Sequence, residues 1–84
     1  MKNKVLINIY VVSLDETYEI YIPVNESVNK ILESTIKLVI EFSDSSFVDN
    51  AEHFFVDPDT MQIYNEANLV RDTNIRNGKL LLLV

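Results

Sequence analysis

One stretch of the chain has the apolar spacing of an amphipathic helix. Over residues 27–42, apolar residues recur every three or four positions, and charged residues fall on the opposite side. The apolar positions are Val28, Ile31, Leu32, Leu38, Val39 and Phe42, with Thr35 in the gap. Ser27 suits the N-cap, because its hydroxyl can accept a hydrogen bond from a free N–H of the first turn. A lone helix with one apolar face needs a sheet to cover it.

Alternation of apolar and polar residues predicts strands on both sides of this helix. Residues 5–12 and 17–24 are typical of an antiparallel hairpin, with Pro23 near the end of an edge strand. Residues 53–56 and 61–64 predict two shorter strands joined by the turn Asp57-Pro58-Asp59-Thr60. The longer loops that follow the helix and the fourth strand have Phe47, Val48, Leu69, Val70 and Ile75 as their expected anchors on the core.

The last strand is apolar on both faces. It follows the turn Asn77-Gly78 and covers residues 79–84, which include four consecutive leucines. Such a run is typical of a central strand with cover on each side, so we expect it beside the first strand. A right-handed crossover through the helix then packs the helix on one face of the sheet. The predicted fold is an α+β β-grasp: a mixed five-stranded (ββαβββ) sheet packed on one helix, in a single domain over residues 1–84.

Composition and charge exclude several classes of protein. The net charge of −6 argues against nucleic-acid binding and against an electrostatic membrane anchor, both of which need a basic surface. No run approaches the ~20 apolar residues of a membrane span, so direct membrane insertion is not expected. The apolar start resembles a signal peptide but is interrupted by Asn8, and no small-residue cleavage site follows. We therefore expect a cytoplasmic protein. With no cysteine, neither a disulfide nor a thiolate metal site can stabilise the fold.

Residues 69–82 resemble the closing segment of the ubiquitin superfamily. A leucine, a polar turn, an isoleucine and a glycine-containing pair precede an apolar final strand. The opening hairpin and the Ser27-capped helix match as well, so the resemblance covers nearly the whole chain. Within the superfamily the chain is most similar to the small bacterial YukD/EsaB group. This resemblance implies a binding module that serves as an accessory or regulatory component of a type VII-like secretion system in the cytoplasm.

The final residues differ from those of ubiquitin itself. Conjugation and sulfur transfer both need a flexible tail that ends in diglycine, whereas this chain ends in Leu83-Val84 and its one glycine is Gly78. We therefore expect neither activity.

The residues offer little for catalysis. His53 is the single histidine, and there is no cysteine nucleophile for it to activate. Asp57 and Asp59 flank Pro58, but they lack the ligand series and the glycine of a calcium loop, so turn chemistry explains them better. No glycine-rich phosphate loop is present. The sequence predicts a protein that is not an enzyme and has no metal or cofactor.

The strongest functional indication is the sheet face that the helix does not cover. If Leu80, Leu82 and Val84 point to the helix, then Leu81 and Leu83 point away from it. The same alternation turns part of the first strand outward. The predicted partner-binding residues are Leu6, Tyr10, Val12, Leu81 and Leu83. A bare apolar patch of this kind favours a protein partner.

Three alternatives accompany this interpretation. The patch could instead pack in a structural homodimer, the chain could be a subunit of another bacterial assembly, or the phase of the strands could differ. The pattern of residues 53–56 leaves open whether Phe54 or Phe55 faces outward. Residues 41–66 are rich in acidic residues and contain no lysine or arginine, so they form either a solvated face or a surface for a basic partner.

Overall fold

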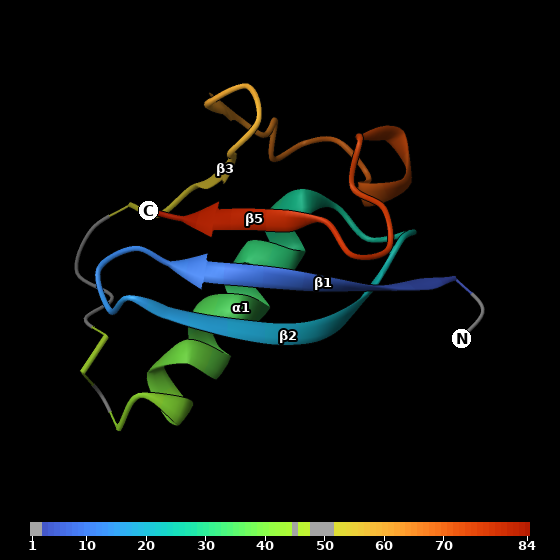
Figure 1. Cartoon of the computed structure of the whole chain (residues 1–84). Helices are drawn as coiled ribbons and strands as arrows, with labels where there is room; N and C mark the ends of the chain where they lie inside the picture. Colours follow the sequence, from blue (N-terminus) through green and yellow to red (C-terminus); the bar gives the residue numbers. More distant parts are fainter. Residues whose placement is uncertain (1–2, 45, 48–51) are drawn as a thin grey trace.

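The computed structural model describes residues 3–44, 46–47 and 52–84, in which one α-helix packs on one face of a five-stranded sheet (Figure 1). The elements are β1 (Lys4–Val11), β2 (Glu16–Pro23), α1 (Val28–Phe42), β3 (Phe55–Asp57), β4 (Gln62–Ile63), the short 3₁₀ helix η1 (Val70–Asp72) and β5 (Leu80–Leu83). Figure 1 views the sheet from the side opposite α1, with the helix behind the strands. This is the β-grasp arrangement that the order of elements predicts.

The sheet has the strand order β2-β1-β5-β3-β4. β1 pairs with β2 antiparallel and with β5 parallel, and β3 runs antiparallel to both β5 and β4. The last strand thus lies in the middle of a mixed sheet beside the first, as its apolar composition predicts. β2 is an edge strand and has Pro23 as its last residue, where a missing N–H donor does no harm.

The helix begins as the sequence predicts. The Ser27 hydroxyl accepts a hydrogen bond from the Lys30 backbone N–H at 3.2 Å, which caps the first turn. The predicted apolar face is buried over Val28, Ile31, Leu32, Thr35 and Val39. The prediction is wrong at the last turn, where Phe42 is exposed and stacks on Tyr18 with ring centroids 6.1 Å apart.

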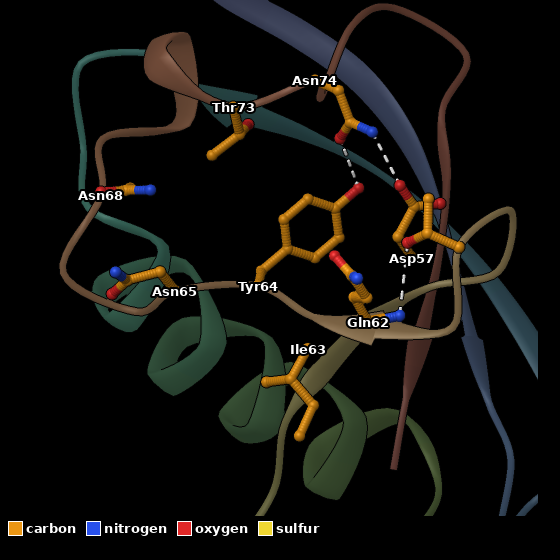
Figure 2. Close-up of a pocket in the computed structure, with 9 residues that line it drawn as sticks. Asp57, Gln62, Ile63, Tyr64, Asn65, Asn68, Thr73 and Asn74 are labelled. Carbon is orange, nitrogen blue, oxygen red and sulfur yellow. Dashed lines mark hydrogen bonds between the residues drawn. The ribbon is translucent and has the colours of Figure 1, made fainter.

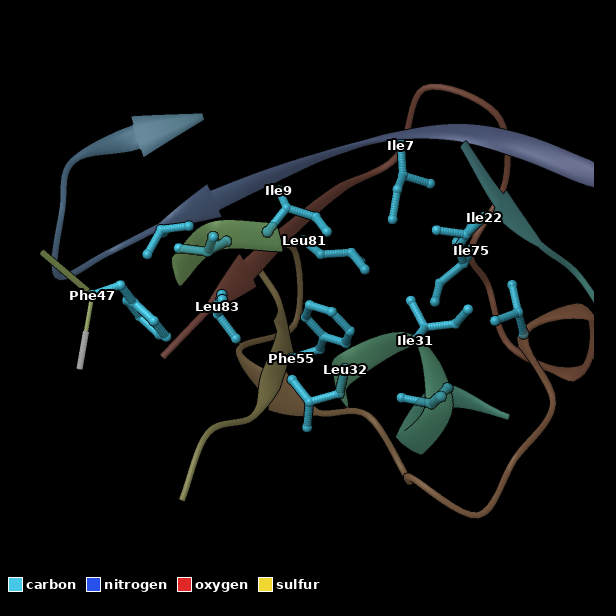
Figure 3. Packing of buried hydrophobic residues seen from close by; sticks show 14 residues of the cluster. Ile7, Ile9, Ile22, Ile31, Leu32, Phe47, Phe55, Ile75, Leu81 and Leu83 are labelled. Carbon is cyan, nitrogen blue, oxygen red and sulfur yellow. The ribbon is translucent and has the colours of Figure 1, made fainter. Parts of the chain in front are cut away.

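The core lies between α1 and the inner face of the sheet (Figure 3). The central strands β1 and β5 and the helix supply most of it, and Phe55 of β3 fills the middle. Phe47, Val70 and Ile75 are buried and fix the two long loops to this core, whereas Leu69 is half-buried. The other predicted anchor, Val48, lies outside the described residues.

The strands after the helix are shorter than predicted. β4 covers Gln62–Ile63, because Met61 lies in the left-handed region at φ 58° and belongs to the turn. Its N–H donates to the Asp57 carbonyl at 2.7 Å. The later turn at Asn77-Gly78 is present as predicted, with Gly78 at φ 86°, a conformation that favours glycine.

Candidate functional site

The register of β5 against β1 decides which leucines face the helix. Ile9 is paired with Leu81, and Val11 with Leu83. Residues that lie opposite one another in a ladder share a face of the sheet, and Ile9 and Val11 lie in the core. Leu81 and Leu83 therefore point toward α1, with 0% and 1% of their surface exposed (Figure 3). The predicted outward orientation of these two leucines is wrong.

The opposite face of β5 is apolar as well. Leu80 and Val84 are 39% and 45% exposed, and Leu82 is half-buried. These three residues were expected to point to the helix, and they point away from it, because the phase of the strand is one residue different from the prediction. The sheet face opposite the helix therefore keeps its apolar character with other residues.

Three of the predicted binding residues do lie on this face. Leu6 and Tyr10 are half-buried, and Val12, just beyond β1, is exposed. Tyr10 is paired with Leu82, so the two strands meet there side by side. We define the outer-face patch as Leu6, Tyr10, Val12, Leu80, Leu82 and Val84.

The surroundings of the outer-face patch add residues that the sequence did not single out. Tyr21 of β2 is paired with Leu6 and is exposed, so it extends the face toward the edge of the sheet. Val56 of β3 is paired with Leu82. Phe55, one residue before Val56, is buried in the core. Of Phe54 and Phe55, it is therefore Phe55 that points inward.

The hydroxyl of Tyr10 is held at the border of the outer-face patch. It donates a hydrogen bond to Asp15 Oδ1 at 2.5 Å, across the turn that connects β1 and β2. This hydrogen bond to a carboxylate raises the pKa of Tyr10 above its ordinary value. The hydrogen bond therefore ties the tip of the Tyr10 side chain to the turn.

A second notable group of side chains lies where the chain enters β5. The Lys79 ammonium lies 2.9 Å from Asp57 Oδ1 and 2.8 Å from Asp59 Oδ2. Asn74 donates to Asp57 Oδ2 at 2.7 Å and accepts from the Tyr64 hydroxyl at 2.6 Å. We call these five residues the Asp57 network. The cation between the two turn carboxylates is thus a lysine of the same chain.

The Asp57 network shifts the ionisation of its members. Hydrogen bonds from Lys79 and Asn74 lower the pKa of the buried Asp57 carboxyl from 3.8 to about 2. Hydrogen bonds to Asp59 and Asp57 raise the pKa of Lys79. Burial raises the pKa of Tyr64 to about 12. All three groups therefore keep their ordinary charge at neutral pH.

The Asp57 network borders a cavity of about 240 Å³ (Figure 2). Its lining residues are Asp57, Thr60, Gln62, Ile63, Tyr64, Asn65, Asn68, Thr73 and Asn74. The side chains of Asp57, Tyr64 and Asn74 form hydrogen bonds with one another or with Lys79. Their polar atoms therefore already have partners within the fold. Within the described part of the chain, no three His, Cys, Asp or Glu side chains gather in a way that could hold a metal ion.

His53 and the acidic segment have structural surroundings. His53 Nδ1 lies 3.3 Å from the Val84 carbonyl oxygen, and its ring centroid lies 4.8 Å from that of Phe47. Of the acidic residues between 41 and 66, Asp57 and Asp59 hold Lys79, and Asp49 lies outside the described residues. Glu41, Asp44 and Glu52 are exposed. Across residues 3–44, 46–47 and 52–84, no helix is both long and apolar enough to cross a membrane.

Three proteins of known structure share this arrangement. A chain of the MycP5-free ESX-5 inner membrane complex, in State II, superposes on 98% of this chain with a TM-score of 0.80 and 9% identity. This chain spans 21% of that longer chain. The ubiquitin-like domain of ECCD1, a type VII secretion system protein of Mycobacterium tuberculosis, gives a TM-score of 0.73 at 13% identity, over 96% of this chain and 97% of that one. A designed protein based on ubiquitin gives 0.71 at 14% identity, over 100% and 90%.

Comparisons of the sequence add no closer relationship. No protein-family model matches the chain, and no curated protein matches its sequence. The similarity therefore concerns the fold, because the sequence identities to the solved structures are low. The chain has one helix packed on a mixed five-stranded sheet and superposes on these structures over nearly its whole length. Its fold is therefore the ubiquitin-like β-grasp fold.

Proposed function

We propose that this chain is a non-enzymatic, ubiquitin-like interaction module that binds a protein partner through its outer-face patch. The observation that carries the proposal is the apolar surface of the central strands β1 and β5 on the side opposite α1. A small domain with a net charge of −6 stays soluble with such a patch, and a partner that covers it gains the free energy of apolar burial.

We further propose that the partner belongs to a type VII-like secretion system, in which this chain is a cytoplasmic accessory or regulatory component. Two considerations support this context. The fold is similar to the ubiquitin-like domain of ECCD1 and to part of a chain in the ESX-5 inner membrane complex. The closing segment of the sequence also resembles the YukD/EsaB group.

A pull-down with matched variants tests the proposal. The baits are the wild type, Leu80→Glu in the outer-face patch, and Met61→Glu, which adds the same charge at an exposed position in the β3–β4 turn. Each folded bait is incubated with a lysate of the source cells, and the bound proteins are identified by mass spectrometry. We expect secretion components with the wild type and with Met61→Glu, and at least a tenfold loss with Leu80→Glu, because a charge in an apolar interface is costly.

The other outcomes decide between the remaining interpretations. Equal recovery of partners by Leu80→Glu would contradict the assignment of the outer-face patch. Recovery of this chain alone would favour a homodimer that buries the patch, provided that the mass in solution rises from that of a monomer to that of a dimer as the protein concentration is raised. Partners from another bacterial assembly would retain the interaction module and contradict its place in secretion.

A further inference from the structure

The turn that leads into β5 contains the one Asn-Gly pair of the chain. Asn77 is followed by Gly78, and no other asparagine precedes a glycine. Asparagine is a chemically labile residue, and it is most labile before glycine, because no side chain shields the next backbone nitrogen from its carboxamide. Asn77 and Gly78 are both exposed, so water reaches them.

The reaction begins with an attack of the Gly78 backbone nitrogen on the side-chain carbon Cγ of Asn77. A bond forms between this nitrogen and Cγ, the bond between Cγ and Nδ2 breaks, and the Gly78 proton leaves with Nδ2 as ammonia. Water then opens the resulting imide ring. Opening at Cγ gives an aspartate. Opening at the backbone carbonyl gives an isoaspartate, in which the main chain runs through Cβ and Cγ and is longer by one CH₂ group.

The folded protein holds the two reacting groups apart. The Gly78 N–H donates to the Leu6 carbonyl at 2.7 Å, and Asn77 Oδ1 accepts from the Leu6 N–H at 2.8 Å. The nitrogen that would attack and the carboxamide that would be attacked are therefore both bound to the same residue of β1. The attack also requires the nitrogen to lose the proton that it donates to Leu6.

The geometry of the turn opposes ring closure as well. The Lys79 N–H donates to the Arg76 carbonyl at 3.0 Å across the turn. Gly78 has a φ of 86°, whereas Asn77 is not among the residues with positive φ, which is the signature of a type II turn. The ψ angle of the second residue in this turn is about +120°. Ring closure needs the Gly78 nitrogen to eclipse Cβ about the Cα–C bond of Asn77, so the turn must open first.

We propose that Asn77 is a site of spontaneous covalent modification, which the pairing of β5 with β1 protects. While β5 is paired, the two hydrogen bonds to Leu6 and the turn prevent ring closure, and the side chain remains an amide. When β5 detaches, the backbone of the turn is free and the reaction proceeds. The modification thus records the opening of β5 as a change of mass and of charge.

The two products have different consequences for β5. An aspartate at position 77 keeps an oxygen that accepts from the Leu6 N–H, so the strand pairs again in its register. An isoaspartate lengthens the main chain before Gly78, so the hydrogen bonds to Leu6 and the ladder of β5 no longer form together. The phase of β5 decides which leucines enter the core, so this product keeps the strand detached. The effect arises within the domain and does not depend on a bound partner.

Deamidation of the full chain in native buffer and in urea at the same pH tests the protection. The rate at position 77 is measured by digestion and mass spectrometry, with chromatography that separates aspartate from isoaspartate. We expect the reaction to be at least tenfold slower in native buffer, because only the open fraction of the folded protein reacts. Asn77→Gln is the control, because its longer side chain closes the ring poorly, and it should show almost no mass gain at this position. Equal rates in the folded and the unfolded chain would overturn the inference.

Matched variants of β5 connect the reaction to the pairing of this strand. Leu83→Ala removes a buried side chain and raises the open fraction, so deamidation of Asn77 in native buffer should accelerate at least tenfold. Leu80→Ala removes an exposed side chain of the same strand and should change the rate by less than about twofold. An unchanged rate in Leu83→Ala would show that the turn opens without β5 and would contradict the proposal. Should this variant fail to fold, the comparison of native buffer with urea still decides.

The purified products test the consequence for the strand. Asn77→Asp should melt within a few degrees of the wild type, whereas the chain with isoaspartate at position 77, separated from deamidated material, should melt at least about 10 °C lower. The amides of Asn8 and Gly78 should also lose their protection from hydrogen exchange in this product, because their acceptors at Lys79 and Leu6 are displaced. An isoaspartate product that melts like the wild type, with both amides protected, would contradict the detachment of β5.

Discussion

The two faces of β5 have nearly the same composition and opposite roles. Leu81 and Leu83 lie in the core against α1, whereas Leu80, Leu82 and Val84 lie on the outer-face patch. The side chains are almost identical, so hydrophobicity does not distinguish them. The difference teaches that the pairing partner sets the phase of a uniformly apolar strand.

That pairing is fixed at the start of the strand. The Gly78 N–H donates to the Leu6 carbonyl at 2.7 Å, and the Leu6 N–H donates to Asn77 Oδ1 at 2.8 Å. These two bonds align β5 with β1 before the first leucine of the strand. A shift of one residue would exchange the two faces, and every leucine of β5 would change its role.

The largest expected difference between the two faces of β5 comes from introducing a charge on each in turn. Leu81→Glu buries a carboxylate in the core, and we expect it to abolish cooperative unfolding at 25 °C, because an unpaired buried charge is not tolerated. Leu80→Glu adds the same charge one residue earlier, and it should change the free energy of unfolding by less than about 1 kcal/mol. Circular dichroism during urea titration measures both. Similar destabilisation of the two variants would contradict the register.

Truncation should give a smaller difference of the same sign. Leu83→Ala leaves a cavity in the core, and we expect a loss of about 2–5 kcal/mol in the free energy of unfolding. Leu82→Ala removes a half-buried side chain of the outer face and should cost about 1 kcal/mol. Urea unfolding of both variants at the same pH tests the difference. A larger loss for Leu82→Ala than for Leu83→Ala would indicate that Leu82, and not Leu83, faces the core, and would contradict the register of β5.

Acid should weaken the polar connection that precedes β5. The pKa of Asp57 is lowered in the folded protein. Its carboxylate therefore stabilises the fold fully at pH values above 3.8, the ordinary pKa of the group. The contribution is lost as the pH falls from about 4 through about 2. Asp57→Asn removes the titrating group, so the difference in melting temperature between the wild type and the variant should shrink by several degrees over this range. A difference that does not depend on pH would contradict the ion pair with Lys79.

The smallest effect concerns the one polar side chain among the buried residues of α1. Thr35→Val keeps the shape and removes a hydroxyl without a hydrogen-bond partner, so we expect a gain of about 1 kcal/mol in the free energy of unfolding. A loss of stability would indicate that this hydroxyl has a partner in solution.

Local patterns in the sequence were enough to predict most of the fold. Ser27 and the apolar spacing after it mark the start of α1, and the alternation of Ile7, Ile9 and Val11 marks the inner face of β1. The composition of the last strand predicts its central place. Each of these features depends on residues close together in the chain.

The side-chain directions in β5 could not be predicted in this way. Four consecutive leucines carry no alternation, so the phase depends on the distant pairing of Ile9 with Leu81. The same holds for the Asp57 network, because Asp57 and Lys79 are 22 positions apart. Leu6, Tyr10 and Val12 were placed correctly, since their own strand alternates clearly.

The most direct test of the central claim is photo-crosslinking from the outer face of β5. The photoreactive amino acid p-benzoylphenylalanine is introduced at position 80 or, as a control, at position 61, and crosslinked proteins are identified after irradiation of living cells. We predict a crosslink from position 80 to a component of the secretion machinery and none from position 61. A partner that crosslinks from position 61, and not from position 80, would contradict the outer-face patch as the interaction surface.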